Sequence, residues 1–275
     1  AETDSDWQFS GFATAGAVYT NADELQFARV GIDAPGGNRV DTGPDSVVGV
    51  QAGLRLGERN TAVVQLVTRE TQRGDYDPRA ALAFISHALT PELTLRAGRL
   101  RSPFFMLSDT ADINYNQTWV RPPVEVYGLN PFSDLDGIDL LHRNRIGETF
   151  VEFHPYVGRS RVPVIGGGRA RLSDLIGMRV TIEAGRLSLS AGYAQADLAV
   201  HRASAATLDL SPQLLARLTG SGADASFSSL GMQWDDGRWR IVAERVKTKA
   251  GEIDLVAKRT GLVAFIEVKW RARAA

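Results

Sequence analysis

The feature of this chain that most limits its fold is a hydrophobic residue at every second position, repeated in short runs along most of its length. In the clearest run, residues 47–56, Val48, Val50 and Ala52 alternate with glycine and polar residues. Successive side chains of a β-strand point to opposite faces, so this period of two indicates strands with one apolar and one polar face. The sequence therefore predicts an all-β protein.

The predicted strands fall into pairs joined by tight turns. After an opening strand over residues 7–19, the pairs are 47–56 with 62–69, 81–89 with 93–100, 138–146 with 149–158, 175–183 with 187–196, and 227–234 with 238–246. The connections between pairs begin near Asn21, Thr71, Arg101, Ser160 and Leu198, and they are longer and rich in Gly, Pro, Asp and Asn. A β-sandwich can mix loop lengths in any order, whereas an outer-membrane barrel alternates them. We predict an antiparallel transmembrane β-barrel of about 11–13 strands with short periplasmic turns and long outer loops.

Composition and charge exclude several other classes of protein. A run of about 18 apolar residues, which a membrane-spanning helix needs, is absent. The 31 Lys and Arg residues nearly balance the 32 Asp and Glu residues, so nucleic acid is not expected as a partner. Cys is absent, which excludes disulfides and thiolate metal sites. The chain opens AETDSDWQFSG without a basic and apolar leader, so we expect a cell outer-membrane protein whose signal peptide precedes this numbering.

Four segments spread over residues 1–246 carry a family resemblance, namely DWQFSGFATAG, RPPVEVYG, DGIDLLHR and DDGRWRIVAER. They resemble a family of proteobacterial outer-membrane porin-like proteins. The resemblance implies a channel in which the segment between Arg101 and Asp136, after the fifth strand, folds inward and narrows the pore. The family has about sixteen strands and ends on an aromatic strand, whereas this chain has fewer strands and ends in two alanines. Whether the strands close alone or by homo-oligomerisation is therefore left open.

Charged residues on the polar strand faces would line the lumen of such a barrel. The predicted pore-lining residues are Arg55, Arg69, Arg96, Arg179 and Glu244, and the arginines would favour anions. The predicted constriction loop carries the acids Asp109, Asp112, Glu125, Asp134 and Asp136, which would oppose the arginines across the pore. The alternatives are lumen arginines neutralised by nearby acids, and loop acids that are merely solvated.

The tail, VKTKAGEIDLVAKRTGLVAFIEVKWRARA, contains the blocks GEID and IEVK. It is similar to the core of the YraN-like endonuclease-related family within the PD-(D/E)XK superfamily. The resemblance implies that Asp254 and Glu267 hold Mg²⁺ while Lys269 stabilises charge at the attacked phosphate. The simpler interpretation is a β-hairpin, residues 252–258 and 262–270, that adds two strands to the sheet. We expect the hairpin, treat these residues as vestigial, and divide the chain into a porin-like barrel (1–246) and a YraN-like hairpin (247–275).

The sequence thus predicts an outer-membrane channel for passive diffusion of small hydrophilic solutes or ions, with an anion preference suggested by the arginines. No enzymatic activity, cofactor or metal is expected, and the partners would be solutes and outer-membrane lipid. Two rival hypotheses stay open. One is a metal-dependent endonuclease acting through the tail, and the other is a non-functional chimera of the two resemblances.

Overall fold

The structure, a computed structural model, describes residues 6–21, 40–71, 74–113, 124–128, 130–164, 168–202, 222–235, 239–246, 252–259 and 262–268. Its strands are β1 (Trp7–Thr14), β2 (Val18–Tyr19), β3 (Val40–Asp41), β4 (Val47–Leu56), β5 (Asn60–Arg69), β6 (Arg79–Ala88), β7 (Leu93–Arg101), β8 (Asp134–Ile146), β9 (Thr149–Pro163), β10 (Gly168–Ala184), β11 (Leu187–Arg202), β12 (Ala223–Asp235), β13 (Trp239–Val246), β14 (Glu252–Arg259) and β15 (Leu262–Val268). A 3₁₀ turn, η1 (Ser108–Thr110), and a short helix, α1 (Val124–Tyr127), lie between β7 and β8.

Within the described residues, 13 strands form one antiparallel sheet in the order β1-β4-β5-β6-β7-β8-β9-β10-β11-β12-β13-β14-β15. Strands β2 and β3 form a separate two-stranded sheet. The all-β antiparallel prediction is confirmed, and β14 and β15 extend the sheet from β13 as the predicted hairpin. Within the described residues β1 and β15 are the two edges, so the sheet is not closed there into a barrel.

Several predicted boundaries were wrong, two of them with consequences for the sheet. The opening strand ends at Thr14, because its ladder partner β4 begins at Val47, the residue opposite Thr14. Residues 18–19 turn away and pair with β3 instead. The connection predicted to be long near Ser160 is short, because β9 continues to Pro163 and β10 starts at Gly168.

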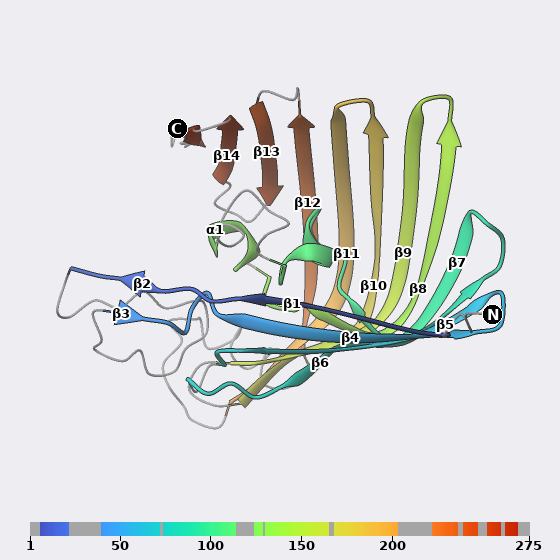
Figure 1. Ribbon diagram of the computed structural model, residues 1–275, viewed down its shortest axis with the longest axis horizontal. Coiled ribbons are helices and arrows are strands. Elements are labelled where there is room, and N and C mark those ends of the chain that lie inside the picture. The colour runs from blue at the N-terminus through green and yellow to red at the C-terminus, as the bar shows by residue number, and fades with distance from the viewer. Residues whose placement is uncertain are drawn as a thin grey trace, which may run out of the picture.

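The sheet is strongly curved, with β1, β4 and β5 lying across the direction of β8 to β12 (Figure 1). Apolar side chains on its outer face are exposed, including Val50 at 56%, Ile85 at 55% and Ile176 at 57%. The tight turns after β8 and β10 lie together at one rim of the sheet (Figure 1). No helix within the described residues is long and apolar enough to span a membrane.

The main hydrophobic core lies between the inner face of the sheet and the segment 102–113 that follows β7. We call this segment the inner loop. Phe104 and Phe105 project from it onto β9 to β12. The centroid of the Phe104 ring lies 6.2 Å from that of Tyr156 and 5.4 Å from that of Phe227. The Ser229 hydroxyl donates a 2.6 Å hydrogen bond to the Phe104 carbonyl. Aromatic burial of this kind fixes the inner loop against the wall.

Candidate functional site

The inner loop is also held by charge. Asp112 forms ion pairs with two guanidinium groups of the wall, those of Arg69 at the end of β5 and Arg101 at the end of β7. Its distance to Arg101 is 2.5 Å, and both side chains are at least nine-tenths buried. Removing one member of a buried pair leaves an uncompensated charge, so this contact ties the loop firmly to both strands.

A second contact joins the inner loop to β10. Asp109, in η1, lies 3.1 Å from the Arg179 guanidinium, whose other amine group donates to the Phe105 carbonyl at 3.2 Å. Burial raises the pKa of the Asp109 carboxyl, but the charge and hydrogen bond of Arg179, together with the nearby His154 and Arg96, lower it by more, so that this pKa lies below its ordinary value. Half of the Asp109 side chain is nevertheless exposed, at 50%. Its contact is therefore weaker than that of Asp112.

Behind these contacts a network of charged side chains crosses four strands of the inner face. Arg96 on β7 donates from Nε to Asp139 on β8 at 2.8 Å, and His154 Nε2 on β9 lies 2.7 Å from the other Asp139 oxygen. Register explains the arrangement, since Arg96 pairs with Asp139 and His154 pairs with Arg179 across neighbouring strands. Cross-strand partners share a face, so the register alone brings these charges together.

Glu152 on β9 completes the network. Its carboxylate accepts a 2.7 Å hydrogen bond from Arg143 on β8 and lies 3.3 Å from Arg179 on β10. The network and the inner loop line a cavity of about 310 Å³, whose walls are Gln65, Leu82, Phe84, Arg96, Leu100, Arg101, Asp109, Leu141, Arg143, Glu152, His154 and Arg179. Each of the four arginines in that lining contacts a carboxylate, so the wall is not an uncompensated positive surface.

The predicted pore-lining residues are only partly brought together. Arg96 and Arg179 join the network and Arg69 reaches the inner loop, whereas Arg55 is exposed at the turn end of β4. Glu244 is the backbone partner of Gly231 on β12, and its side chain lies outside the described residues.

Two of the five predicted loop acids belong to a strand instead. Asp134 is the first residue of β8, and Asp136 lies further along it, where its carboxylate accepts hydrogen bonds from Arg99 at 2.7 and 3.0 Å. The strand starts earlier than predicted because residues 134–136 continue the ladder with β7 up to Arg101. Glu125 lies in α1, with its side chain outside the described residues. Asp109 and Asp112 are the acids that the inner loop brings to the wall.

Sequence reasoning missed Asp139, Arg143 and His154 as site residues. His154 is 1% exposed and contacts Asp139, and neither feature was predicted. The available signal was the alternation itself, which puts His154 and Glu152 on the same face of β9. Predicting the contacts between these side chains also requires the registers of three strand pairs.

At the other end of the chain, Asp254 on β14 is the direct cross-strand partner of Glu267 on β15. The same row continues to Glu244 on β13, the partner of Asp254 on its other side. Lys269 lies outside the described residues, as do the side chains of this row. In the part of the chain whose side chains are described, no group of three potential metal ligands is found.

The tail matches a known family. Residues 235–275 match the sequence profile of the family described as "Uncharacterised protein family UPF0102". The match begins before residue 246 and so takes in β13 as well as the β14–β15 hairpin.

Individual relatives match over the same short region. The UPF0102 protein of Erythrobacter litoralis is 76% identical over 33 residues, 12% of this chain and 28% of the relative. That of Sphingopyxis alaskensis is 65% identical over 37 residues, 14% of this chain and 32% of the relative. That of Rhodopseudomonas palustris is 48% identical over 64 residues, 22% of this chain and 47% of the relative. The chain thus spans less than half the length of these curated relatives, and the predicted C-terminal resemblance is borne out for the tail alone.

Solved structures resemble the chain at low similarity. Outer-membrane-expressed OmpT of Vibrio cholerae superposes with a TM-score of 0.37 at 11% identity, covering 92% of this chain and 79% of that one. A variant of OmpT that lacks loop L8 gives a TM-score of 0.35 at 11% identity, covering 92% and 87%.

Proposed function

We propose that the chain forms the wall of an outer-membrane channel through which small hydrophilic solutes diffuse passively. The observation that supports this most is the distribution of polarity on the two sheet faces. Exposed side chains on the outer face include Val64, Ile138 and Leu230, whereas the inner face carries the ionic network and the inner loop. Soluble proteins rarely expose an apolar surface this extensive, and it suits contact with lipid acyl chains.

In this proposal solutes pass over the ionic network beside the inner loop. Arg143 and Glu152 lie at the wall of the cavity and Asp109 faces them from the loop. Because the arginines are neutralised by carboxylates, we expect weak discrimination between anions and cations rather than the strong anion preference that the arginines alone would give.

The two edges of the sheet within the described residues require that the channel be closed, either by pairing of β1 with β15 or by further strands. Unpaired N–H and C=O groups of an edge strand cost several kcal/mol each in lipid, in round numbers, so an isolated open sheet would not persist there. Homo-oligomerisation or additional chain segments would supply the pairing.

Single-channel conductance tests the proposal. The full chain is refolded into planar bilayers, and discrete conductance steps with similar permeability to potassium and chloride are expected. Asp112→Asn, which frees one anchor of the inner loop, should change the step size. A bilayer that stays silent although the chain has acquired β-structure by circular dichroism would overturn the proposal and favour the non-functional chimera.

A second candidate function concerns the tail. The cross-strand pairing of Asp254 with Glu267 places two carboxylate residues side by side, the residue types that bind Mg²⁺. This arrangement and the family match favour a metal-dependent endonuclease activity as the alternative. Magnesium-dependent nicking of plasmid DNA that disappears in Asp254→Asn would support it, and equal nicking by that variant would exclude it.

A further inference from the structure

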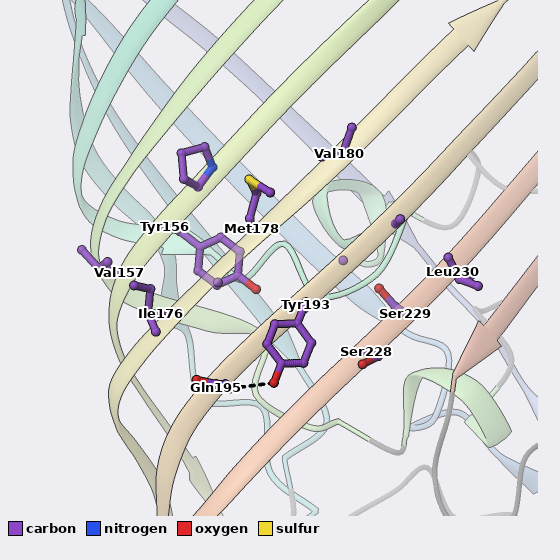
Figure 2. A pocket seen from close by; sticks show the side chains of 14 residues that line it. Tyr156, Val157, Ile176, Met178, Val180, Tyr193, Gln195, Ser228, Ser229 and Leu230 are labelled. Atoms are coloured by element: carbon purple, nitrogen blue, oxygen red, sulfur yellow. Dashed lines mark hydrogen bonds between the residues drawn. The ribbon is translucent and has the colours of Figure 1, made fainter.

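The outer face of β9 to β12 contains an apolar groove separate from the ionic network. Its volume is about 810 Å³, and its outer-face lining comes from Pro155, Val157, Ile176, Met178, Val180, Ala191, Tyr193, Gln195, Ser228 and Leu230. Figure 2 shows Met178, Ile176 and Tyr193 on the near side of the strands and Tyr156 behind them. The Gln195 amide donates to the Tyr193 hydroxyl at 2.6 Å, the polar contact drawn at the groove (Figure 2).

Small residues make the hollow. Gly177 on β10 and Gly192 on β11 border the groove, and Ala191 lies beside Gly192. On the inner face Tyr156 occupies the space over Gly177, and the Ser229 hydroxyl the space over Gly192. A side chain at either glycine would point to the inner face, so the outer hollow comes from the small outer-face residues Ala191 and Ser228, which lie among the larger Met178, Tyr193 and Leu230. This shape accepts an apolar chain.

An arginine cluster lies directly beyond the groove on the same strands and the same face. Arg159 and Arg161 are the next two outer-face positions of β9 after Val157, and Arg171 and Arg169 continue β10 beyond Ile176. All four side chains are exposed. Outer-face positions along a strand are about 7 Å apart, so the cluster begins at the end of the groove.

The positive charges of the arginines in this cluster repel one another. Arg161 and Arg171 are direct cross-strand partners, and like charges in that position destabilise a sheet. Asp136 on β8 is the cross-strand partner of both Arg99 and Arg159, and the exposed Asp174 lies in β10 between Ile176 and Arg171. Asp197 and Asp224 lie on β11 and β12, to one side of the cluster, so the four arginines outnumber the two acids on their own strands and on β8. An anion bound between the arginines of β9 and β10 would remove the repulsion, and guanidinium groups bind phosphate in a bidentate fork.

Strand length places the cluster at a membrane surface. Strands β9, β10 and β11 have 15, 17 and 16 residues, more than the 9–11 or so that cross a bilayer, so their far ends extend beyond the hydrocarbon. The groove belongs to the apolar band and the arginines to the headgroup level. We propose that this surface binds one anionic phospholipid, with an acyl chain in the groove and its phosphate on Arg159, Arg161, Arg169 and Arg171. The inference rests on the proposed function in that it places the outer face in a membrane.

Native mass spectrometry of the full chain, refolded in detergent, tests the site. Phosphatidylglycerol and phosphatidylcholine with identical acyl chains are the probes. We expect one retained phosphatidylglycerol and at least about tenfold weaker retention of phosphatidylcholine. Arg161→Glu/Arg171→Glu should lose that preference. The matched control Arg59→Glu/Arg186→Glu, which makes the same charge change in exposed turns at the opposite rim, should keep it.

A variant that fills the groove separates headgroup binding from lipid binding. Ala191→Phe leaves the arginines in place and should weaken phosphatidylglycerol retention by a similar factor, with unchanged β-sheet content by circular dichroism. Equal retention of both lipids by the wild type would overturn the inference, and so would retention that neither variant affects. Dimers that Ala191→Phe abolishes would also overturn it, because they would show that a second copy of the chain occupies the groove. Arg161→Glu/Arg171→Glu should leave conductance unchanged. Conductance without lipid preference would refute this inference alone, and lipid preference without conductance would refute the channel alone.

Discussion

Asp112→Asn tests whether the inner loop is held mainly by its buried ion pairs. The substitution keeps the shape of the side chain but removes the negative charge that two guanidinium groups share. Exposure of the side chain is 6% for Asp112, 7% for Arg101 and 19% for Arg69, so little solvent is available to compensate the arginines. Breaking a buried pair from one side costs about 3–5 kcal/mol, and we expect a loss of that size in the free energy of unfolding.

The matched control is Asp109→Asn in the same loop. Asp109 is half exposed, and Arg179 keeps Glu152 as a partner when Asp109 is neutralised. The expected loss is therefore no more than about 1 kcal/mol. Urea titration of the refolded protein in detergent, followed by tryptophan fluorescence, measures both. If the two variants lose the same free energy of unfolding, burial of the Asp112 pairs is not what holds the loop.

Three further predictions concern charge, packing and pH. Glu152→Gln releases two arginines from their shared carboxylate and should shift the reversal potential towards anions in bi-ionic bilayer recordings; an unchanged potential would place the solute path elsewhere. Gly177→Ala drives a methyl group into the Tyr156 phenol and should cost about 1–3 kcal/mol of unfolding free energy, whereas Gly53→Ala, whose nearest contact would be 3.8 Å, should cost less than half as much. The pKa of Asp109 lies below its ordinary value, so its contribution to stability is present above about pH 4 and is lost as pH falls through the lowered pKa. Wild type should consequently lose more stability than Asp109→Asn on acidification below that pH, and parallel pH profiles would contradict it.

The strands were largely predictable and the contacts between them were not. Residues 47–56 were predicted to the residue, because alternation and a turn signal agreed. The early start of β8 was not predicted, because Asp134 and Asp136 are polar residues typical of loops. They continue the ladder with β7, and their arginine partners lie on β6 and β7. The sequence around a residue does not indicate a strand partner that lies 30 or more residues away in the chain.

In the candidate site, too, the strand faces were predictable and the contacts were not. Arg96 and Arg179 could be placed on a polar strand face by counting, but their neutralisation by Asp139 and Glu152 depends on register. The porin-like resemblance implied that the segment between Arg101 and Asp136 folds inward, but the two aromatic anchors of the inner loop, Phe104 and Phe105, were not predicted. A hydrophobic pair inside a loop gives no periodic signal.

The odd number of strands in the described sheet has a consequence for topology. In a sheet of 13 strands whose neighbours are all antiparallel, the first and last strands run in the same direction, so β1 and β15 point to the same rim. A ring closed by these two strands would contain one parallel seam, with slanted hydrogen bonds and a slightly weaker ladder than elsewhere. The start of β1 and the end of β15 would then emerge on opposite sides of the bilayer, whereas an even-stranded ring returns both to one side. Labelling of single cysteines introduced before β1 and after β15, with a reagent that cannot cross the membrane, would distinguish the two.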